Sequence, residues 1–361
     1  MPQDANRVLW MPTVPFDMLS EQLRRGEDVV IGEQQQVGRS RARTGVPVRG
    51  EPRNRARAST DEIRSRSDCG ADRAGVGVGD VTGHGVEEHL QERLDALARA
   101  TFALSEPDKA EIAMRRGGRA WRGWFPLEGE LTSGRADRKE GIYFGAELAE
   151  DDPRVAAGLP LHGPNLFPRQ VPDLRPIVLA YLDGMTALGH ALVRGLAVGL
   201  GLDAGWFHDN LTADPPVLFR IFRYPPERDL VDPNWGVAEH TDYGLLTILR
   251  QDAIGGLEVH APSGWIAAPP IPGTFVCNLG DMLERMTGGR YRSTPHRVRN
   301  ASGADRFSFP FFFDPAWDAE VIPVPLPGEG TAAARARWDG EDVFAFDGTY
   351  GEYLLGKVGK V

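Results

Sequence analysis

The residues best suited to chemistry lie in the segment EHTDYGLLTIL, residues 239–249, where His240 and Asp242 are two positions apart. The apolar residues that follow predict a strand. Because side chains alternate along a strand, we expect both side chains to point to one face at the strand end. An imidazole and a carboxylate placed in this way can share a metal ion, although an isolated His-x-Asp pair is common by chance.

His296, in the strand-like segment YRSTPHRVRN, is the candidate for a third ligand. It follows a turn predicted at Thr287-Gly288-Gly289. A tetrahedral zinc site would need further ligands, whereas non-haem iron oxygenases use two His and one carboxylate. That set leaves three positions open on Fe(II), two for a bidentate 2-oxo acid and one for O₂.

A second pattern follows at Arg306-Phe307-Ser308, where Arg306 and Ser308 should share one face of another strand. A guanidinium group inside a largely apolar barrel is costly unless an anion pairs with it. A dicarboxylic acid fits this need, because its distal carboxylate can accept from the arginine and the hydroxyl while its other end chelates the metal.

Three segments together, HTDYGLLTIL, NLGDMLERMTGGRYRSTPHRV and RFS, resemble the isopenicillin N synthase-like family of Fe(II)/2-oxoglutarate-dependent oxygenases. The resemblance covers roughly residues 82–361. Within the family, the sequence is most similar to bacterial members, and it shows some similarity to ethylene-forming enzymes. It implies a mainly β fold with flanking helices, built on a double-stranded β-helix, or jelly-roll, core. It also implies Fe²⁺, 2-oxoglutarate as co-substrate, and O₂.

Carried over position by position, the resemblance assigns the metal to His240, Asp242 and His296, and the co-substrate carboxylate to Arg306 and Ser308. The family tyrosine that reaches 2-oxoglutarate corresponds to Tyr224, in FRYPP. No further catalytic residue is expected beyond the metal centre. The sequence departs from the family pattern two residues earlier, where Phe222 replaces the usual Asn, so the amide that forms part of the family's co-substrate contact is missing.

The spacing of apolar residues predicts the helices and strands that carry these motifs. Apolar residues from Val86 to Leu104 recur every three or four positions and predict a helix, and the run from Leu174 to Leu202 predicts a long buried scaffold helix. After Pro215, short β-type runs indicate an antiparallel sandwich or barrel. We therefore divide the chain into residues 1–80 (divergent and poorly ordered), 81–210 (helical part), 211–320 (jelly-roll core) and 321–361 (C-terminal extension with a helix).

The N-terminal region departs most from the family. The motif VTGHGV at 81–86 is kept, but RAGVGVGD replaces the aromatic strand expected before it, and Asp17 to Thr101 contain no Phe, Trp or Tyr. VPFDML at 14–19 resembles a remnant of the first family strand. Loss of a strand would expose a sheet edge. We hypothesise that residues 20–80 are an out-of-frame translation or a divergent insertion.

Composition narrows the partners and the compartment. The net charge of −10 argues against a general nucleic-acid binder, so a small-molecule substrate is expected. Cys69 and Cys277 form no disulfide or zinc pattern, and no run of 18 apolar residues suggests a membrane span. We expect a cytoplasmic protein.

The expected reaction is oxidation of an unactivated C–H bond by hydroxylation, desaturation or cyclisation, with release of succinate and CO₂. Two alternatives stay open at this point. One is an oxidase or cyclase that does not use 2-oxoglutarate, of the isopenicillin N synthase or amino-cyclopropane-carboxylate oxidase type, in which Arg306 and Ser308 would hold the substrate. The other is a non-catalytic relic of the fold.

Overall fold

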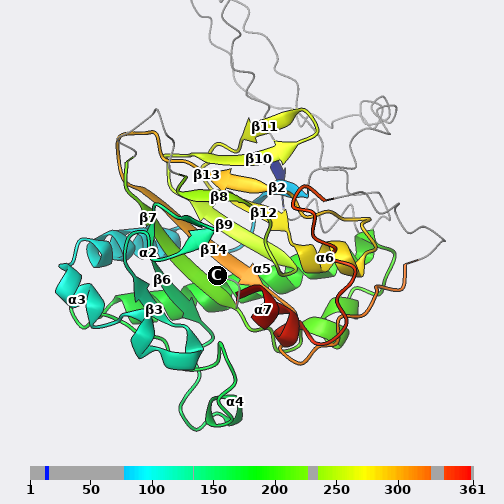
Figure 1. The fold of residues 1–361 in the computed structure, drawn as a ribbon, viewed down its shortest axis with the longest axis horizontal. Coiled ribbons are helices and arrows are strands. Elements are labelled where there is room, and N and C mark those ends of the chain that lie inside the picture. Colours follow the sequence, from blue (N-terminus) through cyan, green and yellow to red (C-terminus); the bar gives the residue numbers. More distant parts are fainter. Residues whose placement is uncertain (1–12, 16–76, 133, 227–234, 327–336, 359–361) are drawn as a thin grey trace, which may run out of the picture.

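The computed structural model describes residues 13–15, 77–132, 134–226, 235–326 and 337–358, and it is dominated by two β-sheets (Figure 1). In order of pairing, the large sheet contains β1 (Thr13–Pro15), β2 (Val78–Thr82), β12 (Phe275–Leu279), β9 (Leu246–Gln251), β14 (Arg306–Phe313), β7 (Leu218–Tyr224), β6 (Glu140–Gly145) and β3 (Gly123–Phe125). The small sheet contains β11 (Gly264–Ala267), β10 (Leu257–Ala261), β13 (His296–Val298) and β8 (Val237–His240). Within these two sheets, only β1 and β2 pair in parallel. A separate two-stranded ribbon joins β4 (Leu131–Thr132) to β5 (Arg135–Ala136).

The large sheet separates two apolar cores because its side chains alternate between its faces. On β7, Phe219 and Ile221 belong to the core between the sheet and the helices, whereas Phe222 and Tyr224 belong to the core between the two sheets. On β14, Phe307, Phe309, Phe311 and Phe313 likewise face the helices. The polar residues at the alternate positions are thereby directed between the sheets.

Helices α2 (Glu88–Phe102) and α5 (Leu174–Gly199) cover the outer face of the large sheet (Figure 1). Gly189 lets α5 approach closely, because a Cβ there would lie 2.3 Å from the ring of Phe313. By length and composition alone, α5 could cross a membrane, but its buried face packs against α2, β9 and β14. This packing agrees with the expected scaffold helix. The remaining helical elements are α3 (Glu106–Ala110), η2 (Met114–Arg116), η3 (Gly118–Ala120), α4 (Pro153–Ala156), η4 (His208–Thr212), α6 (Asp281–Met286) and α7 (Tyr350–Val358).

The two facing sheets agree with the expected jelly-roll core, but the N-terminal part differs from the expectation in two ways. First, β3 and β6 belong to the large sheet although they lie within 81–210, the part expected to be helical. Second, the prediction that the strand before the glycine motif is lost is wrong. β2 pairs with β12 on one side and β1 on the other, and Val78 supplies a buried apolar side chain there. The hypothesis about residues 20–80 falls mostly on residues 16–76, which lie outside the described residues.

Candidate metal centre and active site

His240, Asp242 and His296 come together at one end of the small sheet. His240 is the last residue of β8 and His296 the first of β13, and the two are direct partners in the antiparallel pairing. Asp242 lies in the loop after β8, so the expectation that it shares the strand end with His240 is wrong. Their nitrogen and carboxylate atoms nevertheless all lie within 4.8 Å of one another. Asp242 Oδ1 is 3.9 Å from His240 Nε2, and its Oδ2 is 3.7 Å from His296 Nε2.

Both histidines are oriented by the backbone. His240 Nδ1 lies 2.8 Å from the carbonyl oxygen of Ala238, and His296 Nδ1 lies 3.1 Å from that of Thr294. Because a carbonyl can only accept, each Nδ1 carries the proton and donates it. The Nε2 atom of each ring is then left with a lone pair directed at Asp242, which is the arrangement that a metal-binding imidazole needs.

Asp242 is buried and held by two donors. Thr247 Oγ1 and Asn278 Nδ2 donate to its Oδ2 at 2.6 and 2.7 Å. Burial raises the pKa of Asp242, but the two histidines and these hydrogen bonds outweigh that effect and lower it. Burial, followed by the neighbouring His296, lowers the pKa of His240 to about 3. A neutral imidazole beside an ionised carboxylate is the protonation state in which these groups bind a cation.

The three residues line a cavity of about 760 Å³ that also contains Tyr224, Arg306 and Ser308. Arg306 is fully buried and lies opposite Tyr224 in the β14–β7 pairing. Its guanidinium carbon is 4.8 Å from the ring centre of Tyr224, whose hydroxyl lies 3.4 Å from Ser308 Oγ. The structure thus brings all six predicted site residues into one cavity. Phe222, opposite Ser308, places an apolar wall where the family has an amide.

Arg306 is only partly satisfied by the protein. Its Nε donates to the carbonyl oxygen of Gly255 at 2.5 Å and its Nη2 to Gln251 Oε1 at 3.3 Å. Its buried Nη1 has no hydrogen-bond partner in the described part of the chain. A buried guanidinium nitrogen without an acceptor suits the carboxylate of a bound acid. Two imidazoles and one carboxylate likewise suit Fe(II) with open positions, so the residues present fit both groups.

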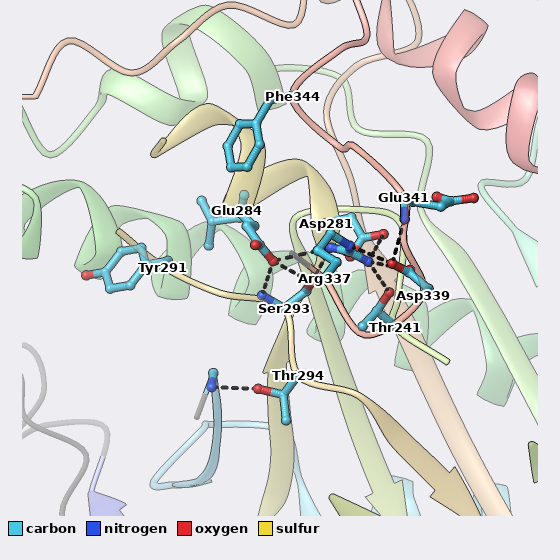
Figure 2. A network of polar contacts seen from close by, with 12 residues as sticks. Thr241, Asp281, Glu284, Tyr291, Ser293, Thr294, Arg337, Asp339, Glu341 and Phe344 are labelled. Carbon is cyan, nitrogen blue, oxygen red and sulfur yellow. Dashed lines mark hydrogen bonds and ion pairs between the residues drawn. The ribbon is translucent and has the colours of Figure 1, made fainter. Parts of the chain in front are cut away.

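Arg337 was missed by the sequence reasoning, and it connects the C-terminal segment to Thr241 and Asp281 (Figure 2). It forms ion pairs with Asp281 at 3.0 Å and Asp339 at 3.0 Å, and its Nη2 donates to Thr241 Oγ1 at 3.0 Å. Thr241 stands between the two candidate ligands of the first motif, and Asp281 begins α6. Nothing in the segment ARARWDG distinguishes this arginine from the many others of the chain. Thr247 and Asn278 were also missed, because only the folded chain brings their side chains to Asp242.

Comparison with known proteins gives the family. Residues 215–315 match the 2OG-Fe(II) oxygenase superfamily, and residues 74–170 match the N-terminal region of the non-haem dioxygenase in morphine synthesis. The chain is 47% identical over 307 residues to a probable iron/ascorbate oxidoreductase of Dictyostelium discoideum, covering 78% of this chain and 84% of that protein. It is 35% identical over 322 residues to 1-aminocyclopropane-1-carboxylate oxidase of Dictyostelium mucoroides, covering 78% and 85%. The crystal structure of a Neurospora crassa protein in complex with alpha-KG and thymine superposes with a TM-score of 0.63 at 27% identity, covering 79% and 87%.

Fold, cavity and sequence relatives together define a non-haem iron oxygenase. The chain belongs to the 2OG-Fe(II) oxygenase superfamily, and its core is the jelly roll expected from the sequence. It is an Fe(II)- and 2-oxoglutarate-dependent oxygenase that uses Fe²⁺, 2-oxoglutarate and O₂. The two alternatives, an oxidase without 2-oxoglutarate and a non-catalytic relic, are not favoured. Membership of the bacterial branch stays a prediction.

Proposed function

We propose that this oxygenase oxidises an unactivated C–H bond of a small molecule bound in the cavity between the two sheets, by hydroxylation, desaturation or cyclisation. His240, Asp242 and His296 would hold the iron. With 2-oxoglutarate and O₂, the bound iron supplies a strong oxidant while 2-oxoglutarate is converted to succinate and CO₂. The observation that carries the proposal is the presence, in one cavity, of a metal-binding triad and a buried guanidinium nitrogen without an acceptor.

The roles of the remaining residues follow from their positions. Arg306 would bind the distal carboxylate of 2-oxoglutarate through its free Nη1, assisted by the hydroxyls of Ser308 and Tyr224. Gly255 and Gln251 hold the guanidinium in place by accepting from its other nitrogens. The rings of Phe222 and Tyr224 form an apolar wall beside these polar groups. Binding and orientation are thus the protein's share of the reaction.

An anaerobic titration tests the proposal. Fe(II) and 2-oxoglutarate are added to the protein while the weak visible charge-transfer absorption of the chelate is followed. We expect the band in the wild type, its loss in His240→Ala, and a weaker affinity for 2-oxoglutarate in Arg306→Ala. The exposed His89→Ala and Arg116→Ala variants serve as matched controls and should behave as the wild type. A folded wild type without the band would refute the proposal.

Two of the similar proteins suggest compounds to test as substrates. One relative is named for 1-aminocyclopropane-1-carboxylate and a solved neighbour contains thymine. We therefore propose testing both compounds for stimulation of succinate release, followed by mass spectrometry of the product. A gain of one oxygen indicates hydroxylation. A loss of two hydrogens indicates desaturation or cyclisation, and NMR of the product distinguishes a new double bond from a new ring. The cytoplasmic location stays a prediction.

A further inference from the structure

Arg220 is a charged residue inside the active-site cavity for which the proposed chemistry has no use. It lies on β7, and side-chain alternation places it on the same face as Phe222 and Tyr224, the face that lines the cavity. Its guanidinium carbon lies 4.1 Å from the ring centre of Tyr143 and 4.9 Å from that of Phe312. Aromatic rings contact the flat face of a guanidinium, so its in-plane N–H donors stay available.

Those donors have no acceptor within the described residues: Arg220 makes neither a hydrogen bond nor an ion pair there. The other cationic side chains of the cavity all have acceptors. Lys139 pairs with Glu130 and Asp137, Lys357 with Glu341, Arg122 with the carbonyl oxygen of Leu161, and Arg306 with Gly255 and Gln251. Arg220 is therefore distinguished among the cations that line the cavity.

Apart from its contacts with the rings of Tyr143 and Phe312, Arg220 is stabilised only by charges that it does not contact through hydrogen bonds. Burial lowers the pKa of Arg220, but attraction from Tyr143, Glu130 and Asp242 outweighs burial and raises it. Glu130 is already engaged by Lys139. Once a divalent cation binds to Asp242, the negative charge of that carboxylate is compensated. The loaded site consequently leaves Arg220 with a greater need for an anion than the metal-free protein does.

Arg220 and Arg306 stand at different places on the same sheet face. Arg306 pairs across the strands with Tyr224, which lies four positions beyond Arg220 on β7. At the usual rise of a strand this places the two backbone positions roughly 13 Å apart. Phe312, against which Arg220 packs, lies at the opposite end of β14 from Arg306. The two arginines are thus positioned to bind two different anions.

We infer that Arg220 binds a carboxylate of the substrate, so that the substrate class of this oxygenase is a small organic acid; this inference rests on the proposed function. A carboxylate matches the planar donors of a guanidinium. A singly charged group also suits a site with one free cation and with Glu130 nearby, whereas a phosphate dianion would find no second free cation among the described residues of the cavity.

A binding experiment without turnover tests the inference. The protein is loaded with Zn(II) in place of Fe(II) and with N-oxalylglycine in place of 2-oxoglutarate. Benzoate, benzamide and phenyl phosphate are then titrated and followed by saturation-transfer NMR and calorimetry. Benzoate and benzamide have nearly the same shape and differ in charge. The variants are Arg220→Gln, Arg220→Lys and, as a control at an exposed position, Arg116→Gln.

We expect saturable benzoate binding in the wild type and a loss of about 10- to 100-fold in Arg220→Gln, the value of a hydrogen-bonded charge. Arg220→Lys should be intermediate, because it keeps the charge but not the paired donors. Arg116→Gln should equal the wild type, and benzamide should bind at least about tenfold more weakly than benzoate. In the ¹⁵N-arginine-labelled wild type, benzoate should shift one Nε resonance, identified by its absence from Arg220→Lys. This measurement does not depend on the folding of Arg220→Gln.

Three results would overturn the inference. They are equal benzoate affinity in the wild type and folded Arg220→Gln, no saturable benzoate binding together with an unshifted Arg220 resonance, and benzamide binding as tightly as benzoate. Tighter binding of phenyl phosphate than of benzoate would overturn the carboxylate assignment. N-oxalylglycine binding is measured first, since its failure would count against the proposed function itself. If N-oxalylglycine binds and benzoate is indifferent to Arg220, only the inference fails.

Discussion

Replacing Arg337 by Gln should destabilise the protein strongly, because it leaves a buried carboxylate without its counter-charge. The side chain of Arg337 is 8% exposed and that of Asp281 1% exposed, and their closest atoms are 3.0 Å apart. Removing one member of a buried ion pair costs about 3–5 kcal/mol of the free energy of unfolding. The same change removes the hydrogen bond from Arg337 to Thr241 Oγ1, which joins the C-terminal segment to the residue between His240 and Asp242 (Figure 2).

A double-mutant cycle and a pH series separate this cause from a general packing defect. Arg337→Gln combined with Asp281→Asn lacks the unpaired charge, so it should be more stable than the sum of the single changes predicts, by at least about 1 kcal/mol. Burial raises the pKa of Asp281, while Arg337 and the nearby hydroxyls lower it. The effect of burial is the larger, so the pKa of Asp281 is raised. Loss of Arg337 raises this pKa further. A carboxyl group whose pKa is raised in the folded state destabilises the protein increasingly as the pH rises. The loss of unfolding free energy in Arg337→Gln should therefore shrink as the pH falls toward 3.8, the ordinary pKa of an aspartate.

Urea unfolding followed by tryptophan fluorescence measures these free energies. Arg116→Gln, at an exposed position, is the matched control and should remain within about 0.5 kcal/mol of the wild type. The reasoning is refuted if Arg337→Gln unfolds within about 1 kcal/mol of the wild type. It is equally refuted if Asp281→Asn adds its full cost to that of Arg337→Gln.

Three further changes test the metal centre and its surroundings. Asn278→Ala removes one of two hydrogen bonds to Asp242 and should weaken Zn(II) affinity by about 10- to 100-fold in a chelator competition; unchanged affinity would contradict the orienting role. Burial raises the pKa of Asp314 from 3.8 to about 7, so the metal-free wild type should lose up to roughly 4 kcal/mol of stability as the pH rises from about 3.8 to about 7. Asp314→Asn should flatten this dependence, and parallel pH curves in urea unfolding would argue against it. Gly280→Ala would place its Cβ 2.2 Å from the carbonyl oxygen of Gly244, so it should displace the loop carrying Asp242; Zn(II) binding equal to that of the wild type would speak against this displacement.

Much of the fold could be predicted because the decisive signals are local. Alternation and turn residues located β7, β9, β10, β12 and β14, and the spacing of apolar residues located α2 and α5. The strands β3 and β6 were not predicted. β3 has three residues, and β6 is buried along its whole length, so neither shows the alternation of polar and apolar residues that marks a half-buried strand. β2 was not expected for a related reason: two of its five residues are Gly79 and Asp80, which rarely favour a strand, and it exists because β12 pairs with it.

For the site, sequence reasoning succeeded where chemistry requires a particular residue type. His240, His296 and Arg306 stand out because few structural roles call for them in apolar surroundings. Arg220 and Arg337 did not stand out, because the chain is rich in arginine and their importance comes from neighbours distant in sequence. Arg337, for example, contacts Asp281 and Thr241 through tertiary folding alone. Contacts of this kind leave no periodic trace in a sequence.

The position of the two histidines opposite each other has a mechanical consequence. β13 is three residues long and its pairing with β8 shifts register between His296 and Val298, so few ladder hydrogen bonds hold these strands together. A one-residue slip would turn either imidazole to the opposite side of the sheet. An ion held by His240 and His296 therefore acts as a cross-link that closes the chain between them and fixes the alignment of the strands, much as a disulfide would. Amide hydrogen exchange in β8 and β13 should accordingly slow when metal is added. Metal binding and the correct alignment of the two strands are then coupled, so that each favours the other.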